Sequence, residues 1–184
     1  LFEHVMFEGT QHVPDADHLR LIEEAGGDLN GTTSLDRTNF YDVVPVNELE
    51  TVLWLESDRM GFLLPALTQA KLDGQREVVK NERRERIEQP PFGTEPLVLS
   101  AAIYPSGHPY SWPTIGSMAD LTAATLDDVK EFFRQYYGPN NATLAVVGDI
   151  DVASTKGMIE KYFGSIPRGP ALVPPSRGPA AVAV

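Results

Sequence analysis

The chain has 184 residues, which is enough for one sizeable hydrophobic core, and we predict one folded domain. It carries 26 acidic residues against 15 Lys and Arg, and this acidic balance argues against a nucleic-acid partner, which needs clustered positive charge. It has no cysteine, which excludes disulfides and thiol chemistry, and no apolar run near the roughly 20 residues of a membrane span.

The first half of the chain is predicted to form helices around a pair of strands. Apolar residues recur at three-residue spacing over residues 16–25, which indicates a short helix that ends at two glycines. Residues 36–45 are rich in strand formers, and together with residues 30–33 they suggest a strand pair. Residues 46–63 carry apolar side chains at helical intervals, and the charged residues 69–89 are predicted to form a further helix with a narrow apolar side.

The second half contains two further predicted helices and one predicted strand. Thr125 supplies a hydroxyl cap before residues 126–133, whose apolar positions form a buried face. Residues 143–147 form an apolar run of strand length. Asp151 is expected to cap a last helix that runs through Phe163.

The order of these elements predicts the fold class and the extent of the domain. Strands joined as neighbours favour an α+β fold, mostly antiparallel sheet packed against helices, over a doubly wound parallel sheet. After Gly164 the chain becomes Pro, Gly, Ala and Val without periodicity, which is typical of a linker. We therefore predict a folded domain over residues 1–167 and an interdomain linker over residues 168–184.

A glutamate and a histidine stand together at the start of the chain, in Leu1-Phe2-Glu3-His4. In the motif His-x-x-Glu-His, the two histidines face the same way on a helix and bind one zinc ion, and the glutamate lies beside the metal-bound water. Glu3 and His4 fit the last two positions, and the first histidine would be the residue immediately before Leu1. Taken alone, the pair is more typical of a surface helix end. Of the other histidines, His18 falls on the polar side of a predicted helix and is expected to be solvated.

Several segments, in this order along the chain, resemble the peptidase family typified by pitrilysin, insulin-degrading enzyme and the mitochondrial processing peptidase. These segments are residues 1–10, 26–33, 36–41, 108–110, 115–116 and 136–149. The resemblance implies a zinc metallopeptidase domain of the α+β class. It also implies that the opening strands of the domain precede the motif helix and are missing from this chain.

The resemblance implies the remaining residues of a zinc site. The third ligand of the family is a glutamate on a downstream helix, and residues 77–82 match that segment and place the ligand at Glu82, 78 residues after His4. Without the resemblance, this charged helix indicates a solvated face with i,i+4 ion pairs. The family commonly carries another glutamate two turns earlier, where this chain has Gln75, an amide that keeps hydrogen bonding but removes a charge near the ligands.

The segment Asn30-Gly31-Thr32 has two interpretations. In relatives a similar segment is an edge strand to which an extended peptide substrate is added as one more strand, with Asn30 against the substrate main chain. The alternative is a tight turn, since Asn-Gly is the commonest hairpin pair. Both interpretations stay open from the sequence.

The predicted function is that of a zinc-dependent endopeptidase or oligopeptidase with Glu3 as the general base. The family implies a second homologous domain or subunit that closes a clamshell around the peptide. The alternative is a non-catalytic partner or core subunit of a heterodimeric assembly. The chain as given is expected to have little or no activity, because the first histidine is absent, and bacterial relatives slightly favour an exported, periplasmic protein.

Overall fold

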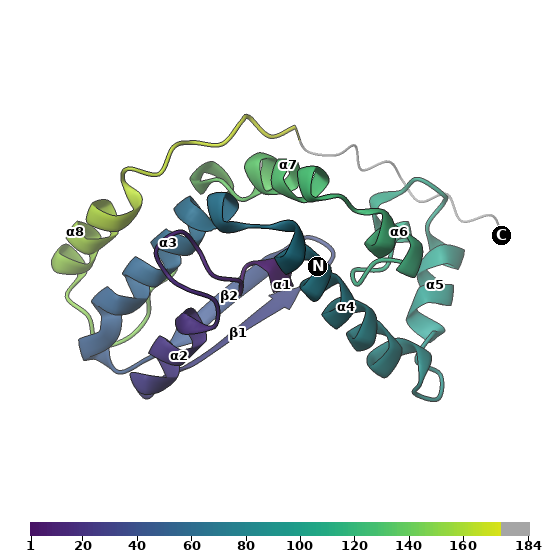
Figure 1. The fold of residues 1–184 in the computed structure, drawn as a ribbon, viewed down its shortest axis with the longest axis horizontal. Coiled ribbons are helices and arrows are strands. Elements are labelled where there is room, and N and C mark those ends of the chain that lie inside the picture. Colours follow the sequence, from purple (N-terminus) through teal and green to yellow (C-terminus); the bar gives the residue numbers. More distant parts are fainter. Residues whose placement is uncertain (174–184) are drawn as a thin grey trace.

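The computed structural model describes residues 1–173, in which helices surround one antiparallel hairpin (Figure 1). Short 3-10 turns lie at Val46–Glu48, Pro109–Ser111 and Pro139–Asn141, and a π-helical turn at Arg84–Glu88 continues the fourth helix. The elements are α1 (Phe2–Val5), α2 (Asp17–Glu24), β1 (Asp28–Thr33), β2 (Thr38–Val43), α3 (Leu49–Ala66), α4 (Gln69–Arg83), α5 (Glu95–Ile103), α6 (Met118–Ala123), α7 (Leu126–Tyr136) and α8 (Val152–Phe163).

The sheet of the described residues consists of β1 and β2 alone. The two strands pair antiparallel, from Asp28 opposite Val43 to Thr33 opposite Thr38. One edge of β1 is therefore hydrogen-bonded to β2, and its outer edge pairs with no other strand within residues 1–173. The predicted α+β class, with an antiparallel sheet packed against helices, is confirmed.

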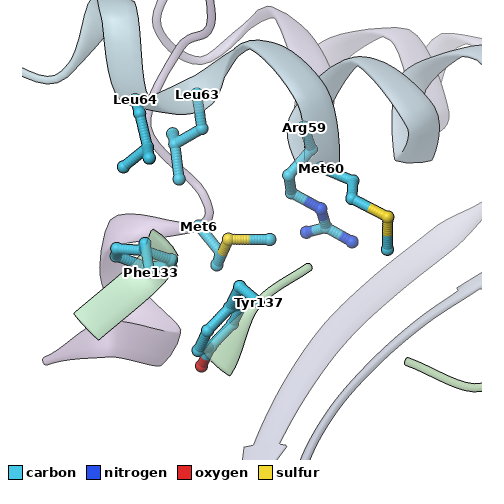
Figure 2. A pocket seen from close by; sticks show the side chains of 7 residues that line it. All are labelled: Met6, Arg59, Met60, Leu63, Leu64, Phe133 and Tyr137. Atoms are coloured by element: carbon cyan, nitrogen blue, oxygen red, sulfur yellow. The ribbon is translucent and has the colours of Figure 1, made fainter. Parts of the chain in front are cut away.

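The main hydrophobic core holds the motif helix α1 in place. Val5 is fully buried and Met6 nearly so, because both side chains point away from the solvated side of α1 into the space between three longer helices. A small cavity of about 30 Å³ lies beside Met6, with Arg59 and Tyr137 on its walls (Figure 2). The buried partners of Val5 and Met6 come from α3, α4, α7 and the residue after α3: Leu63, Leu67, Leu72, Val129 and Phe133.

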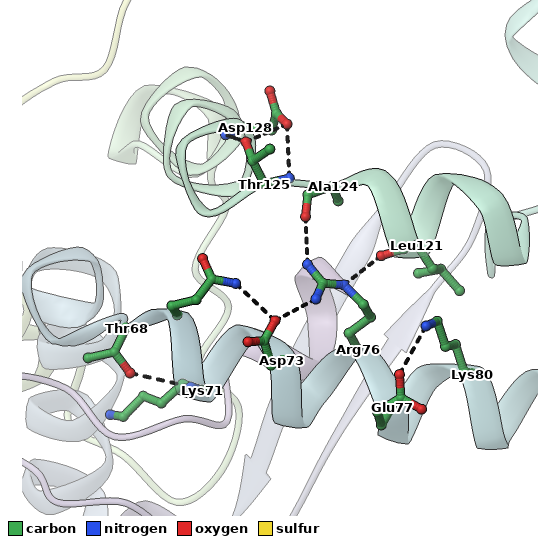
Figure 3. Close-up of polar contacts among 11 residues, drawn as sticks. Thr68, Lys71, Asp73, Arg76, Glu77, Lys80, Leu121, Ala124, Thr125 and Asp128 are labelled. Atoms are coloured by element: carbon green, nitrogen blue, oxygen red, sulfur yellow. Dashed lines mark hydrogen bonds and ion pairs between the residues drawn. The ribbon is translucent and has the colours of Figure 1, made fainter.

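Helix α4 is fixed at its start and along one side (Figure 3). The Thr68 hydroxyl caps it by accepting a hydrogen bond from the Lys71 backbone N–H at 3.3 Å, which satisfies one of the free donors of the first turn. The Arg76 guanidinium donates to the carbonyl oxygens of Leu121 at 2.7 Å and Ala124 at 2.6 Å. These bonds tie α4 to the end of α6, and so they set the direction in which the far end of α4 projects.

Most predicted elements are present, and one is wrong. Helices α2, α3, α4, α7 and α8 and the strand pair lie where the sequence predicts them, with Thr125 and Asp151 as the caps of α7 and α8. Residues 143–147 do not form a strand, because no other strand in the described part of the chain pairs with them, and Val147 is 95% exposed. Helices α5 and α6 were not predicted.

Two further predictions concern the interdomain linker and membrane-spanning segments. Residues 168–173 of the predicted linker contain no helix or strand, and its remainder lies outside the described residues, so the domain boundary stays a prediction. Within residues 1–173, every helix is too short or too polar to cross a membrane.

Candidate active site

Helices α1 and α4 meet at His4 and Glu82. The Nε2 atom of His4 lies 3.3 Å from Oε2 of Glu82, and the two side chains are 26% and 24% exposed. Zinc bonds to histidine nitrogen and carboxylate oxygen are about 2.0–2.1 Å long, so tetrahedral geometry separates two ligand atoms by about 3.3 Å. The two residues that the resemblance names as ligands therefore fit one metal ion, and both remain accessible from solvent.

The second carboxylate oxygen of Glu82 takes part in an ion pair. Its Oε1 lies 2.7 Å from Nη1 of Arg86, one turn further along the helix. The alternative interpretation of this helix, a face with i,i+4 ion pairs, is thus also present. Because Arg86 contacts Oε1 and His4 contacts Oε2, the two interactions do not compete for the same atom.

The predicted base, Glu3, lies where β1 crosses α1. Its Oε2 accepts a hydrogen bond from the Thr33 hydroxyl, and its Cγ would be 3.1 Å from a Cβ at Gly31. The same Cβ would be 3.1 Å from the ring of Phe7, so a side chain at position 31 would push the Glu3 and Phe7 side chains aside by a few tenths of an ångström. Thr33 was missed as a site residue, although a strand points its side chain to the same face as position 31.

Asn30 and Gln75 line one open pocket beside the motif helix. The pocket has a volume of about 490 Å³, and Phe7 and Leu29 give it apolar walls. Nε2 of Gln75 donates to Oε1 of Glu8 at 2.7 Å, which places this amide against the segment after α1. The predicted roles of Gln75 near the metal, and of Asn30, Gly31 and Thr32 toward substrate, stay predictions.

A buried cluster of ionisable side chains connects α2, β2 and α3. Nε2 of His18 lies 3.7 Å from Oε1 of Glu56 and 4.0 Å from Oδ1 of Asp42, and His18 is only 7% exposed. The expectation that His18 is solvated was wrong. The sequence held a signal for its burial, because His18 stands four residues before the buried Ile22 on the same helical face.

The geometry of this cluster also bears on metal binding. One ligand atom each from His18, Asp42 and Glu56 lies within 4.8 Å of the others, a spacing that could hold an ion. However, the Arg59 guanidinium forms an ion pair with the Glu56 oxygen that faces His18. A fixed positive charge at this position opposes a cation, which argues against a metal ion in this cluster.

Burial sets the protonation of the cluster. It raises the pKa of Asp42 to about 8, an effect that the neighbouring Glu56 carboxylate reinforces. It lowers the pKa of His18 to about 4, with a further contribution from the positive charge of Arg59. Although burial opposes its ionisation, the pKa of Glu56 is lowered by the Arg59 guanidinium. Near pH 7 the cluster therefore holds a protonated Asp42, a neutral His18 and one Glu56–Arg59 ion pair.

The free energy of unfolding should depend on pH because the pKa values of Asp42 and His18 differ between the folded and unfolded chain. Burial raises the pKa of Asp42 to about 8 in the folded protein, whereas in the unfolded chain its pKa is near the ordinary aspartate value of 3.8, so the Asp42 contribution to stability falls as pH rises. His18 acts oppositely between pH 4 and 6.5, and the two contributions cancel there. From pH 6.5 to pH 8 the His18 contribution no longer changes, and the Asp42 contribution to the free energy of unfolding should drop by about 2 kcal/mol.

Urea unfolding of wild type and of Asp42→Asn at pH 6, 7, 8 and 9 measures this effect. The Asn variant cannot titrate, so the difference between the two proteins isolates Asp42 from every other group that titrates in this range. Parallel pH profiles for the two proteins would contradict the raised pKa.

Sequence models of two domain types match the chain. The insulinase model, peptidase family M16, covers residues 1–109, and the model described as the peptidase M16 inactive domain covers residues 123–183. The zinc protease PqqE of Helicobacter pylori is 32% identical over 168 residues, which are 90% of this chain and 37% of the relative. The chain thus spans less than two fifths of the length of that relative.

Solved structures share the fold. A protease from Helicobacter pylori has a TM-score of 0.88 and 31% identity, with 96% of this chain and 42% of that chain covered. The first half of the periplasmic protease PqqL from Escherichia coli has a TM-score of 0.80, with 98% and 39% covered, and at 23% identity it supports the fold alone. The family model over residues 1–109 and the 32% identity to a zinc protease place this chain in the insulinase family, peptidase family M16.

Proposed function

We propose that the chain forms part of a zinc-dependent metallopeptidase that hydrolyses peptide bonds in extended peptides. The observation that carries the proposal is the 3.3 Å separation of His4 Nε2 and Glu82 Oε2, two atoms contributed by helices 78 residues apart in sequence. His4 and Glu82 would be two zinc ligands, and the residue encoded before Leu1 would be a histidine and the third. The name of the H. pylori relative, a zinc protease, supports the same chemistry.

Each proposed site residue has its own role in peptide hydrolysis. Bound zinc would lower the pKa of its water to about 7 and polarise the scissile carbonyl. Glu3, adjacent to His4 on α1, accepts a proton from the attacking water and later returns it to the nitrogen of the leaving amine. Glu82 and His4 fix the metal, while the core packing of Val5 and Met6 keeps α1 in its place against α4.

The outer edge of β1 is the proposed site for the substrate main chain. Within residues 1–173 this edge has no strand partner, so the backbone groups of Asn30, Gly31 and Thr32 could pair with an extended peptide. Binding of this kind makes little demand on the side chains of the peptide. The 490 Å³ pocket beside Asn30 would receive one substrate side chain, because its lining offers apolar contacts from Phe7 and Leu29 beside the carboxylates of Glu8 and Asp15.

A second half would complete the binding chamber. Because the chain spans 37% of the H. pylori relative, we propose that a second homologous domain or subunit closes over the β1 edge like a clamshell. The expectation of an exported, periplasmic protein stays a proposal.

The alternative is a non-catalytic partner subunit of a peptidase-like assembly. It is favoured by Gln75, which stands where the family commonly has a glutamate and which hydrogen-bonds to Glu8 rather than to either proposed ligand. Loss of that negative charge would weaken the field around a zinc ion. Metal content separates the two proposals.

Zinc analysis and a peptide-cleavage assay test the proposed function. The full-length protein should bind one zinc per site and cleave an unstructured peptide, and its gene should encode histidine before Leu1. The chain of residues 1–184 should hold much less than one equivalent and cleave little or nothing, because two ligands retain zinc far less well than three. One tightly bound equivalent on residues 1–184 would contradict this site, and a full-length protein without zinc would favour the partner subunit.

A further inference from the structure

Thr33 lies where it can control the orientation of the Glu3 side chain. It is the last residue of β1 and shares a strand face with Gly31, which lies against Cγ of Glu3. Its Oγ1 donates a hydrogen bond to Oε2 of Glu3. A hydrogen bond from a hydroxyl to a carboxylate is stronger than one between neutral groups, so it can hold this carboxylate in one orientation.

A second hydroxyl group stands behind Thr33. Thr38 is directly opposite in the hairpin register, with its Oγ1 3.3 Å from that of Thr33.

The supply of protons gives this pair of hydrogen bonds a direction. A carboxylate can only accept hydrogen bonds, and a threonine hydroxyl has a single proton. Once Thr33 donates to Glu3, the contact between the threonines requires Thr38 to donate to Thr33. Both hydroxyl donors then point toward Glu3, and each bond polarises the next.

We propose that Thr33 is a positioning residue for the general base, and that Thr38 fixes the Thr33 hydroxyl. The terminal torsion of a glutamate is broad, so an unrestrained carboxylate samples many orientations. Holding Oε2 leaves Oε1 directed at the attacking water in one orientation. This inference rests on the proposed function, because it needs Glu3 to act as the base.

Thr33→Val and Thr33→Ser test the inference in the full-length protein. Valine keeps the shape but removes the donor, and kcat should fall roughly 10- to 100-fold, with KM within about twofold and zinc content unchanged. Serine keeps the donor and should restore kcat to within about threefold of wild type. Thr143→Val, at an exposed position outside the hairpin, is the matched control and should leave both constants unchanged.

Three outcomes would overturn the proposal. An unchanged kcat in Thr33→Val removes the positioning role, and a raised KM at constant kcat assigns Thr33 to substrate binding instead. A Thr33→Ser variant as slow as Thr33→Val shows that shape, and not the hydrogen bond, matters.

A double-mutant cycle separates this proposal from the proposed function. Glu3→Ala and Thr33→Val should be coupled by a factor of about five in the unfolding equilibrium constant of the metal-free full-length protein. Additive effects would show that the contact does not form, and would overturn the inference even in an active peptidase. If the wild type cleaves no peptide, the proposed function fails by itself, and coupling in the cycle then reduces Thr33 to a structural partner of Glu3.

Discussion

Glu3→Gln in the full-length protein should retain its zinc and lose peptide cleavage by about 10²- to 10⁴-fold, the usual contribution of a general base. Glutamine has nearly the same size, so Thr33 can still donate to its amide oxygen and α1 keeps its packing. Glu3 is not a proposed ligand, since Glu82 lies against His4. The loss should therefore fall on kcat, while the metal stays bound.

Zinc content and steady-state cleavage of one peptide, measured on the same preparation, check this expectation. Glu131→Gln on α7 is a suitable control, because that carboxylate is 70% exposed and its ion pair within residues 1–173 is with Arg134 on its own helix. Cleavage by Glu3→Gln within tenfold of wild type would remove Glu3 from the role of base. Loss of zinc together with activity would instead place Glu3 among the ligands.

Glu82→Ala should abolish zinc binding with little effect on the metal-free fold. Removing a ligand should weaken zinc by more than the roughly 100-fold that loss of an outer-shell partner costs. The side chain also leaves Arg86, but that guanidinium is 76% exposed, so water solvates it at little cost. The free energy of unfolding of the metal-free protein should therefore change by less than about 1 kcal/mol.

Competition with a chromophoric chelator measures the zinc affinity, and urea unfolding in excess chelator measures the metal-free stability. Glu85→Ala is the matched control. Glu85 is exposed and lies three residues after Glu82, so its removal deletes the same charge from the same charged segment and should leave zinc bound. Equal zinc affinity in Glu82→Ala and wild type would contradict the ligand assignment. A large drop in metal-free stability would assign Glu82 a structural role instead.

Local signals in the sequence were sufficient for the helices whose caps and apolar faces agree. Thr125 and Asp128 form a reciprocal cap at the start of α7, and Val129 and Phe133 lie buried one turn apart behind it. Asp151 caps α8 in the same way. Residues 143–147 have the composition of a strand, but a strand also needs a partner, and its own residues do not specify one.

The sequence likewise predicts some residues of the candidate site and not others. The order of short segments along the chain indicates the family and predicts His4, Glu3 and Glu82 as site residues. It did not indicate Thr33 or the cluster of His18, Asp42 and Glu56, because those contacts join segments that are distant in sequence. Asp42 and Glu56, for example, become neighbours only when β2 packs against α3.

The sequence by itself determined most of the elements, the family and the residue types available for a zinc site, because periodicity and capping act over a few turns of chain and the motifs follow the order of the family. Only the tertiary structure decided that His4 and Glu82 stand 3.3 Å apart, that Thr33 donates a hydrogen bond to Glu3, and that the pKa of Asp42 is raised to about 8. The physical reason is that ligand spacing and pKa values depend on distance and burial in space. The spacing of His4 and Glu82 arises when the core around Val5 and Met6 brings α1 and α4 together, and the burial of Asp42 arises where β2 packs beside α2 and α3.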